Sequence, residues 1–172
     1  MITQDLKLWL DIGLVRSGKM KKVELRQIIR EALEDKVKEC PAPTQDLELN
    51  TSNRNRAIKA DFIKYGPLNL SDEGYWEEYA KKWGPTTSAE EAKKSNCSNC
   101  VAFDISPRME SCMPGSTDED GRLGYCWMHH FKCHSARTCY TWAAGGPIKD
   151  DEKSYDWQKR NLKGDLSTKP IS

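Results

Sequence analysis

Cysteine is the residue type most able to do chemistry in this 172-residue chain. Six of its seven cysteines fall within 43 consecutive positions, and these are Cys97, Cys100, Cys112, Cys126, Cys133 and Cys139. The C-x-x-C spacing of Cys97 and Cys100 lets two thiolates bind one metal ion, or one iron each in a cluster. Segment 126–142 adds three histidines and two tryptophans to three of the cysteines. This density of thiolate and imidazole donors predicts a metal site, whereas the isolated Cys40 is expected to be incidental.

Three other uses of the cysteines compete with an iron–sulfur centre. A thioredoxin-like redox pair needs a helix after the C-x-x-C motif, and Pro107 interrupts the segment that follows. Disulfides would stabilise a core-poor chain, but only outside a reducing cytoplasm. Zinc would combine Cys97 and Cys100 with two further ligands, drawn from Cys126, His129, His130, Cys133 and Cys139. We favour iron–sulfur over zinc because the segment offers more thiolates than one zinc ion takes.

The cysteine pattern resembles that of high-potential iron–sulfur proteins. In that family a C-x2-C pair precedes two further cysteine ligands, and a Cys-x-x-Trp or Gly-aromatic-Cys element closes the site. One register places Cys126 and Cys139 as third and fourth ligands, 13 positions apart, with Trp142 closing the site. A second register uses Cys112 and Cys126, 14 positions apart. The first keeps the Cys-x-x-Trp element, although it needs a long excursion between Cys100 and Cys126.

The resemblance therefore implies a 4Fe-4S cluster bound by Cys97, Cys100, Cys126 and Cys139, with Cys112 and Cys133 as alternates. Such a cluster would cross-link four positions of a chain that has little apolar material. Several aromatic side chains are expected to shield it from water, and these are Phe103, Tyr125, Trp127, Phe131, Tyr140 and Trp142. The three histidines, His129, His130 and His134, would then be hydrogen-bond partners of the ligands or surface groups.

A wider resemblance, over roughly residues 60–150, is to cysteine-rich virion structural proteins of tailed bacteriophages, especially those of marine cyanobacteria. The similar stretches are 65–69, 91–95, and 124–148 with its closing Gly145-Gly146-Pro147-Ile148. This resemblance implies a structural protein of the virion, at the tail or head–tail connection, assembled in the host cytoplasm among other virion subunits. A soluble electron-transfer protein and a zinc-stabilised interaction module are the alternatives.

Composition narrows the possible functions. The chain has 27 Lys and Arg against 26 Asp and Glu, a net charge of +1, so no strong field favours nucleic acid or a membrane surface. No apolar run reaches transmembrane length, and the N-terminus lacks the pattern of a secretory signal. We find no Ser/His/Asp set or carboxylate pair of a catalytic site. The sequence thus predicts a protein that is not an enzyme.

The elements around the cysteines follow from apolar periodicity and capping residues. Residues 1–39 are expected to form a helical hairpin, whose second helix carries an apolar stripe that includes Leu25 and Ile28. Residues 40–60 are polar and rich in turn formers, which predicts an extended linker. Ser71 should cap a helix that carries Tyr75, Trp76, Tyr79 and Trp83. The Ser88 to Glu91 segment has the form of a capping box.

The whole chain is thus expected to be a small, α-rich and irregular protein. A metal-centred, loop-rich, high-potential-like iron–sulfur module would occupy residues 61–150. The polar segment 151–172 is expected to be an extended tail.

Overall fold

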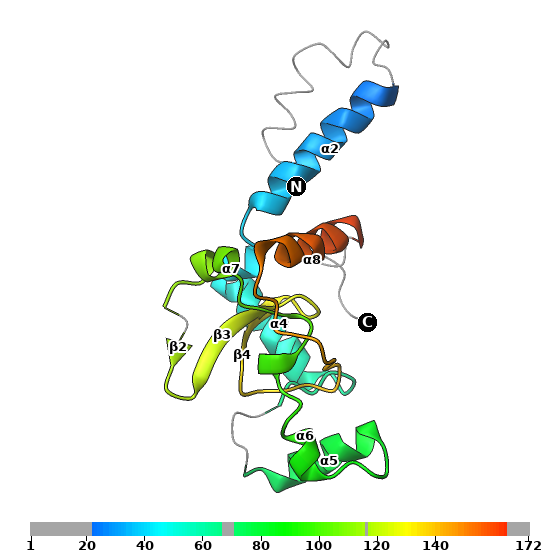
Figure 1. Ribbon diagram of the computed structural model, residues 1–172, viewed down its shortest axis with the longest axis vertical. Coiled ribbons are helices and arrows are strands. Elements are labelled where there is room, and N and C mark those ends of the chain that lie inside the picture. The colour runs from blue at the N-terminus through cyan, green and yellow to red at the C-terminus, as the bar shows by residue number, and fades with distance from the viewer. Residues whose placement is uncertain (1–21, 67–70, 116, 165–172) are drawn as a thin grey trace. The chain divides into compact units, whose positions relative to one another are not determined.

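The computed structural model describes residues 22–66, 71–115 and 117–164 (Figure 1). The chain divides into two compact units, residues 1–39 and residues 40–172. Within the described residues the protein is α-rich, as the sequence predicts, with one small antiparallel sheet.

The first unit contributes helix α2, Lys22–Lys38, which is the second helix of the predicted hairpin. The first predicted helix lies outside the described residues. Leu25, Ile28 and Ile29 on α2 are 46%, 41% and 51% exposed, and the nearby Val23 is 70% exposed. Several members of the apolar stripe predicted for this helix are therefore exposed.

Strand β3, Gly121–Cys126, is the centre of the sheet in the second unit. It pairs antiparallel with β1 (Phe103–Asp104), β2 (Thr117–Asp118) and β4 (Phe131–His134). Cys126 is opposite both Phe103 and Phe131, one on each side. The sheet therefore carries the middle of the cysteine-rich segment into the core.

Residues 40–60 are helical, so the prediction of an extended linker was wrong. They form α3, Ala42–Gln45, and α4, Leu47–Lys59, which packs beside β4 (Figure 1). The side chain of Asp46 caps α4 by accepting a bond from the Leu49 N–H. Asn50 accepts a 2.7 Å bond from the Lys132 N–H, and Asn53 donates a 2.7 Å bond to the His130 carbonyl. These polar residues are thus inward-facing contacts of a helix.

The predicted aromatic helix is present as α5, Glu73–Trp83, although Asp72 rather than Ser71 supplies its cap. The predicted capping box is confirmed, since Ser88 and Glu91 exchange hydrogen bonds at the start of α6, Ala89–Ala92. The two helices enclose a small core that we call the aromatic cluster, made of Trp76, Tyr79, Ala80 and Ala92.

Residues 151–164 form helix α8, so an extended tail from residue 151 was also a wrong prediction. This helix packs on α7, Pro107–Cys112. Arg108 on α7 donates to the Ser154 hydroxyl at 2.9 Å and also bonds to Gln158. The Asp151 carboxylate accepts from the Arg108 N–H at 3.0 Å. A buried arginine therefore docks a helix whose sequence is mostly polar.

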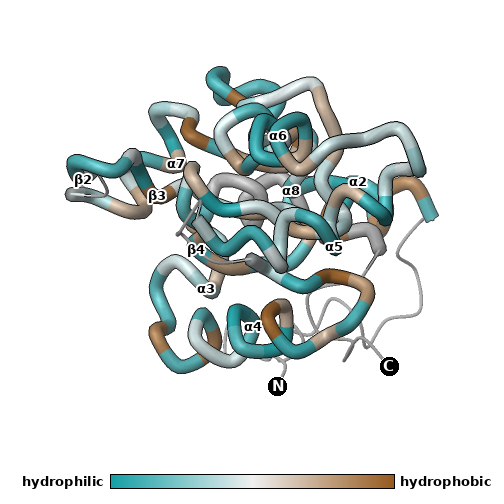
Figure 2. Tube along the Cα trace, turned by 90° about the horizontal axis from the view of Figure 1, so that it is seen from below, coloured by the Kyte–Doolittle hydropathy of each residue, from teal (hydrophilic) through white to brown (hydrophobic). Residues whose placement is uncertain are grey.

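The main core of the second unit is built largely from sulfur-containing and aromatic side chains. We call it the thiol core, and its principal buried members are Tyr65, Cys97, Cys100, Phe103, Met109, Tyr125, Trp127, Phe131, Cys133 and Cys139. Runs of hydrophobic residues along the chain are short and are interrupted by polar residues (Figure 2). Few aliphatic residues are available here, so cysteine fills positions that Leu or Ile would normally occupy.

Candidate metal centre

Five free cysteines come together from three segments of the thiol core. Cys97 begins a short 3-10 helix, Cys97–Asn99, and Cys100 follows directly. Cys126 ends β3, Cys133 lies in β4, and Cys139 lies in the loop beyond β4. All are buried except Cys126, which is partly buried.

Backbone bonds join the C-x-x-C turn to the second cysteine segment. The Cys97 N–H donates to the Arg137 carbonyl at 2.7 Å, and the Ser98 N–H donates to the Ser135 carbonyl at 3.0 Å. Asn96 caps the turn by accepting from the Ser98 N–H at 3.1 Å. The sequence thus brings cysteines about 40 positions apart to one place through main-chain pairing.

The sulfurs are close enough to perturb one another. Burial, followed by the side chains of Cys126 and Cys97, raises the pKa of Cys133 well above its usual value, whereas the Cys133 side chain lowers the pKa of Cys126. Burial also raises the pKa values of Cys100 and Cys139, and the charges of Cys126 and Cys97 add to both increases. The arrangement holds Cys133 as a protonated donor beside a more acidic Cys126.

Burial raises the pKa values of Cys100 and Cys139, and nearby main-chain N–H groups partly oppose it, from Ala143 and Ala102 at Cys100 and from Thr141 at Cys139. The main-chain N–H groups of Met128 and His129 help to lower the pKa of Cys126. Main-chain N–H groups near a sulfur stabilise thiolates over thiols, and they tune the potential of iron–sulfur clusters.

Gly146 permits the closest backbone approach in this region. A Cβ atom at this position would lie 1.7 Å from the Cys100 carbonyl oxygen, so no other residue fits without a shift of the backbone. The Gly146 N–H donates to the Asn99 carbonyl at 3.1 Å. The Gly-Gly-Pro segment therefore packs directly against the C-x-x-C turn.

Four of the six aromatic residues that the sequence predicts as a shield are buried members of the thiol core. Phe103, Tyr125, Trp127 and Phe131 are almost completely buried, whereas Tyr140 and Trp142 are partly buried. Tyr65, which we did not predict, packs edge-on against Phe131 at 4.9 Å between centroids, and its hydroxyl accepts from the His134 N–H. Its position beside Gly66-Pro67 gave no sequence signal for a role in the core.

The three histidines make hydrogen bonds to groups other than the thiols. His129 Nε2 lies 2.6 Å from the Thr141 hydroxyl, which in turn lies 3.2 Å from the Cys139 sulfur. Burial lowers the pKa of His129 to about 4, aided by the charges of His130 and Arg56. His130 Nδ1 is 3.3 Å from the Tyr125 hydroxyl, and His134 Nδ1 accepts from the Ala136 N–H.

Cys40 and Cys112 form a disulfide across 72 residues of sequence. The expectation that Cys40 is incidental was therefore wrong. The alternate ligand register, which needs a free Cys112 thiolate, is incompatible with this bond. Helix formation explains the error, because α3 and α4 fold back on β4 and so return Cys40 to the end of α7.

The donor set fits an iron–sulfur cluster in its chemistry. Soft thiolates with N–H donors and an apolar surround are the typical environment of such clusters. Within the described part of the chain, no group of three or more Cys, His, Asp or Glu side chains has the arrangement of a metal-ion site. Cys97, Cys100, Cys126 and Cys139 would hold a 4Fe-4S cluster, and this fit rests on donor type and burial.

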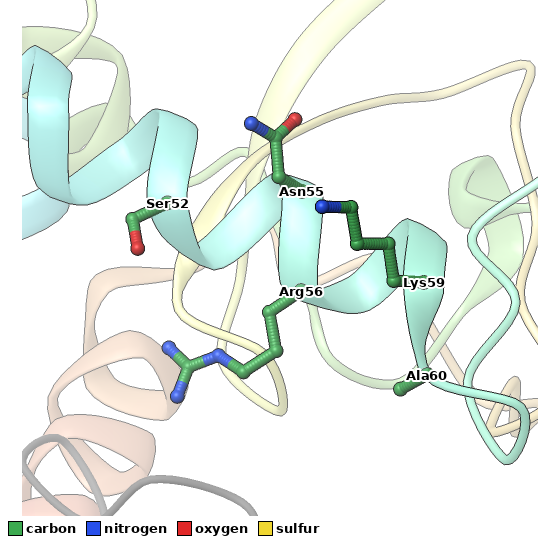
Figure 3. Close-up of a pocket in the computed structure, with 5 residues that line it drawn as sticks. All are labelled: Ser52, Asn55, Arg56, Lys59 and Ala60. Atoms are coloured by element: carbon green, nitrogen blue, oxygen red, sulfur yellow. The ribbon is translucent and has the colours of Figure 1, made fainter.

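A pocket of about 500 Å³ lies on the outer side of α4, and the residues that line it are Ser52, Asn55, Arg56, Lys59 and Ala60. Figure 3 shows that the Arg56 and Lys59 side chains extend in different directions, so their charges do not converge on one point. None of its lining residues is a cysteine. The pocket therefore shares no residue with the candidate metal centre.

Comparison of the chain with protein-family models, with curated proteins and with solved structures gives no match. Among the helices in residues 22–164 that the structure describes, none is long and apolar enough to cross a membrane.

Proposed function

We propose that this protein is a structural component of a phage virion whose thiol core is held together by a 4Fe-4S cluster. Cys97, Cys100, Cys126 and Cys139 would supply the ligands. The observation that carries the cluster is that Cys97, Cys100, Cys126 and Cys139 are free thiols of one core. The Cys133 side chain lowers the pKa of Cys126, whereas burial raises the pKa values of Cys100 and Cys139.

The proposed role of the cluster is structural. The four ligands belong to three separate segments, so ligation would cross-link the C-x-x-C turn, β3 and the loop after β4. Because the unfolded chain has no preformed site, the free energy of ligation adds directly to folding. A protein whose hydrophobic residues make up only 37% of the chain gains most from such a cross-link.

The virion assignment is supported by the resemblance to cysteine-rich phage structural proteins. The exposed apolar residues of α2 are consistent with it, because an uncovered apolar helix surface is typical of segments that bind other proteins. The partners would be neighbouring virion subunits.

A zinc-stabilised interaction module is the second candidate. It is favoured by the influence of both the Cys97 and Cys126 side chains on the pKa of Cys133, which places three possible thiolate ligands in one region. In that case Cys133 would be a ligand, and the iron–sulfur assignment of Cys139 would be wrong.

Metal and sulfide content of protein purified without oxygen tests these candidates. About four irons and four acid-labile sulfides per chain, with visible absorption, are expected. Cys139→Ala should lose the iron, and the matched variant Cys133→Ala should keep it. One zinc without sulfide, lost from Cys133→Ala, would establish the zinc module instead. Unreactive thiols and no metal would overturn both.

The virion assignment has its own test. Quantitative mass spectrometry of purified particles should find the protein at a fixed copy number after gradient centrifugation in high salt. Its presence only in the soluble fraction of the lysate would exclude the virion role and leave the cluster proposal intact.

A further inference from the structure

Helix α2 is exposed on every side along residues 22–32, the part of the helix whose side chains the structure describes. It belongs to a different compact unit from the thiol core and the aromatic cluster. A helix of this length is only marginally stable in water unless its apolar side chains pack against something. The apolar residues of α2 therefore need a partner surface.

These apolar residues are concentrated on one side of the helix. At about 100° per residue, Leu25, Ile28, Ile29 and Ala32 fall on one face, and we call them the α2 stripe. Val23, which is 70% exposed, lies nearly opposite this face. The α2 stripe is thus the side of the helix suited to packing, and Val23 marks the other side.

Charges of opposite sign lie along the two edges of the α2 stripe. Lys22 and Arg26 are on one edge, whereas Glu24 and Glu31 are on the other. In a parallel pair of identical helices, the basic edge of each copy lies beside the acidic edge of the other, as in a coiled coil. In an antiparallel pair, edges of like charge would meet and repel.

We propose that α2 binds the α2 of a second copy of this chain, in parallel, with the α2 stripe at the seam. The charges point to this occupant because one edge of the helix is complementary to the other edge of the same helix. Arg26 would lie beside Glu24 of the second copy, a contact that occurs twice in the symmetric pair. The inference concerns α2 alone and is independent of metal binding by the thiol core.

The consequence is that the protein would enter any larger assembly as a dimer. The proposed virion role leaves the first partner of α2 open, and this pairing identifies it as the same protein. Neighbouring subunits of other kinds would then contact surfaces outside the α2 stripe.

Sedimentation velocity of the full-length protein over a range of concentrations tests the pairing. The wild-type protein should sediment as a dimer and dissociate on dilution. Ile28→Asp should abolish the dimer, because it buries an unpaired charge at the seam. Val23→Asp is the matched control, the same new side chain on the opposite face, and should leave the dimer unchanged. A wild-type protein that is monomeric at every concentration, or equal loss of dimer in both variants, would overturn the pairing and leave residues 1–21 or a different subunit as the cover of the stripe.

Charge reversal tests the orientation. Arg26→Glu and Glu24→Arg should each weaken dimerisation about tenfold, because each replaces two attractive contacts by two repulsive ones. An equimolar mixture of the two variants should recover the wild-type affinity, since opposite charges then face each other again. Simple loss of helix stability would not be reversed by mixing. Failure of the mixture to dimerise, or stronger dimerisation of Arg26→Glu alone, would overturn the parallel pair.

Discussion

The aromatic cluster and the thiol core use different means to fill a protein interior. In the aromatic cluster, Trp76 and Tyr79 are fully buried and pack edge-on at 6.0 Å. The thiol core contains several fully buried aromatics too, but cysteines join them at its centre. Large rings supply apolar area directly, whereas a small thiol supplies little area and would gain its value from the proposed ligation. The comparison predicts that one core is stable without metal and that the other depends on the proposed cluster.

The largest expected effect is the loss of one proposed ligand from the thiol core. Cys126→Ser should lower the free energy of unfolding by more than about 5 kcal/mol, because ligation is removed and the segments it joins separate. Hydrogen exchange should accelerate in β3 and β4 and remain slow in α5. Cys133→Ala is the control, with a cost of about 1–2 kcal/mol. Simultaneous loss of protection in α5 would show that the two cores are one cooperative unit.

The reciprocal change targets the aromatic cluster. Trp76→Ala should cost about 3–5 kcal/mol, because it leaves a cavity where a large ring was completely buried. Iron content per folded chain should stay at the wild-type value. The neighbouring exposed Glu77→Ala should change stability by less than about 0.5 kcal/mol. Iron loss in the Trp76 variant would break the proposed independence of the two cores.

The Cys40–Cys112 disulfide is a covalent cross-link that needs no metal. Cys40→Ala should cost about 2–4 kcal/mol, because the bond closes a long loop in the unfolded chain. Denaturant titration of the oxidised protein measures this cost. After mild reduction, the wild-type protein and the variant should have the same stability. If Cys40→Ala were as stable as the oxidised wild type, the disulfide would add nothing to stability, and the proposed ligation alone would account for the cross-linking of this core.

The smallest effect concerns His129 and pH. Its folded pKa of about 4 lies below its ordinary value of 6.5, so only the unfolded state binds the proton between these pH values. Stability should therefore fall as pH decreases from 6.5 to 4, by up to about 3 kcal/mol. His129→Gln should remove that part of the pH dependence. An identical pH profile in the variant would assign the change to other titratable groups.

Local signals were read correctly from the sequence. The aromatic spacing from Tyr75 to Trp83 and the capping box at Ser88 are set by residues three or four positions apart, and both helices formed as predicted. Five of the six clustered cysteines are free thiols of one core, whereas Cys112 is in a disulfide, and metal binding by them stays a prediction. These features depend on short-range patterns that a single sequence contains.

Long-range contacts explain what the sequence could not reveal. α4 was read as a linker because its asparagines are poor helix formers, yet Asn50 and Asn53 bond to the turn and strand some 80 residues later. Similarly, α8 is stabilised by Arg108 of α7. The Cys40–Cys112 pairing depends on that same folding back. Residues that pair across such long separations leave no short-range sequence pattern from which the contact could be predicted.

The bonds between α4 and β4 also have a consequence during synthesis. Asn50 precedes its partner Lys132 by 82 residues. A ribosome adds about 5–20 residues per second, so α4 is synthesised roughly 4 to 16 s before β4, the strand on which it packs. Throughout that interval the nascent chain presents its inward-facing asparagines and the early thiols to the cytosol. Final assembly therefore waits for the last third of the chain, and insertion of the proposed cluster, which needs all four ligands, would be a late event.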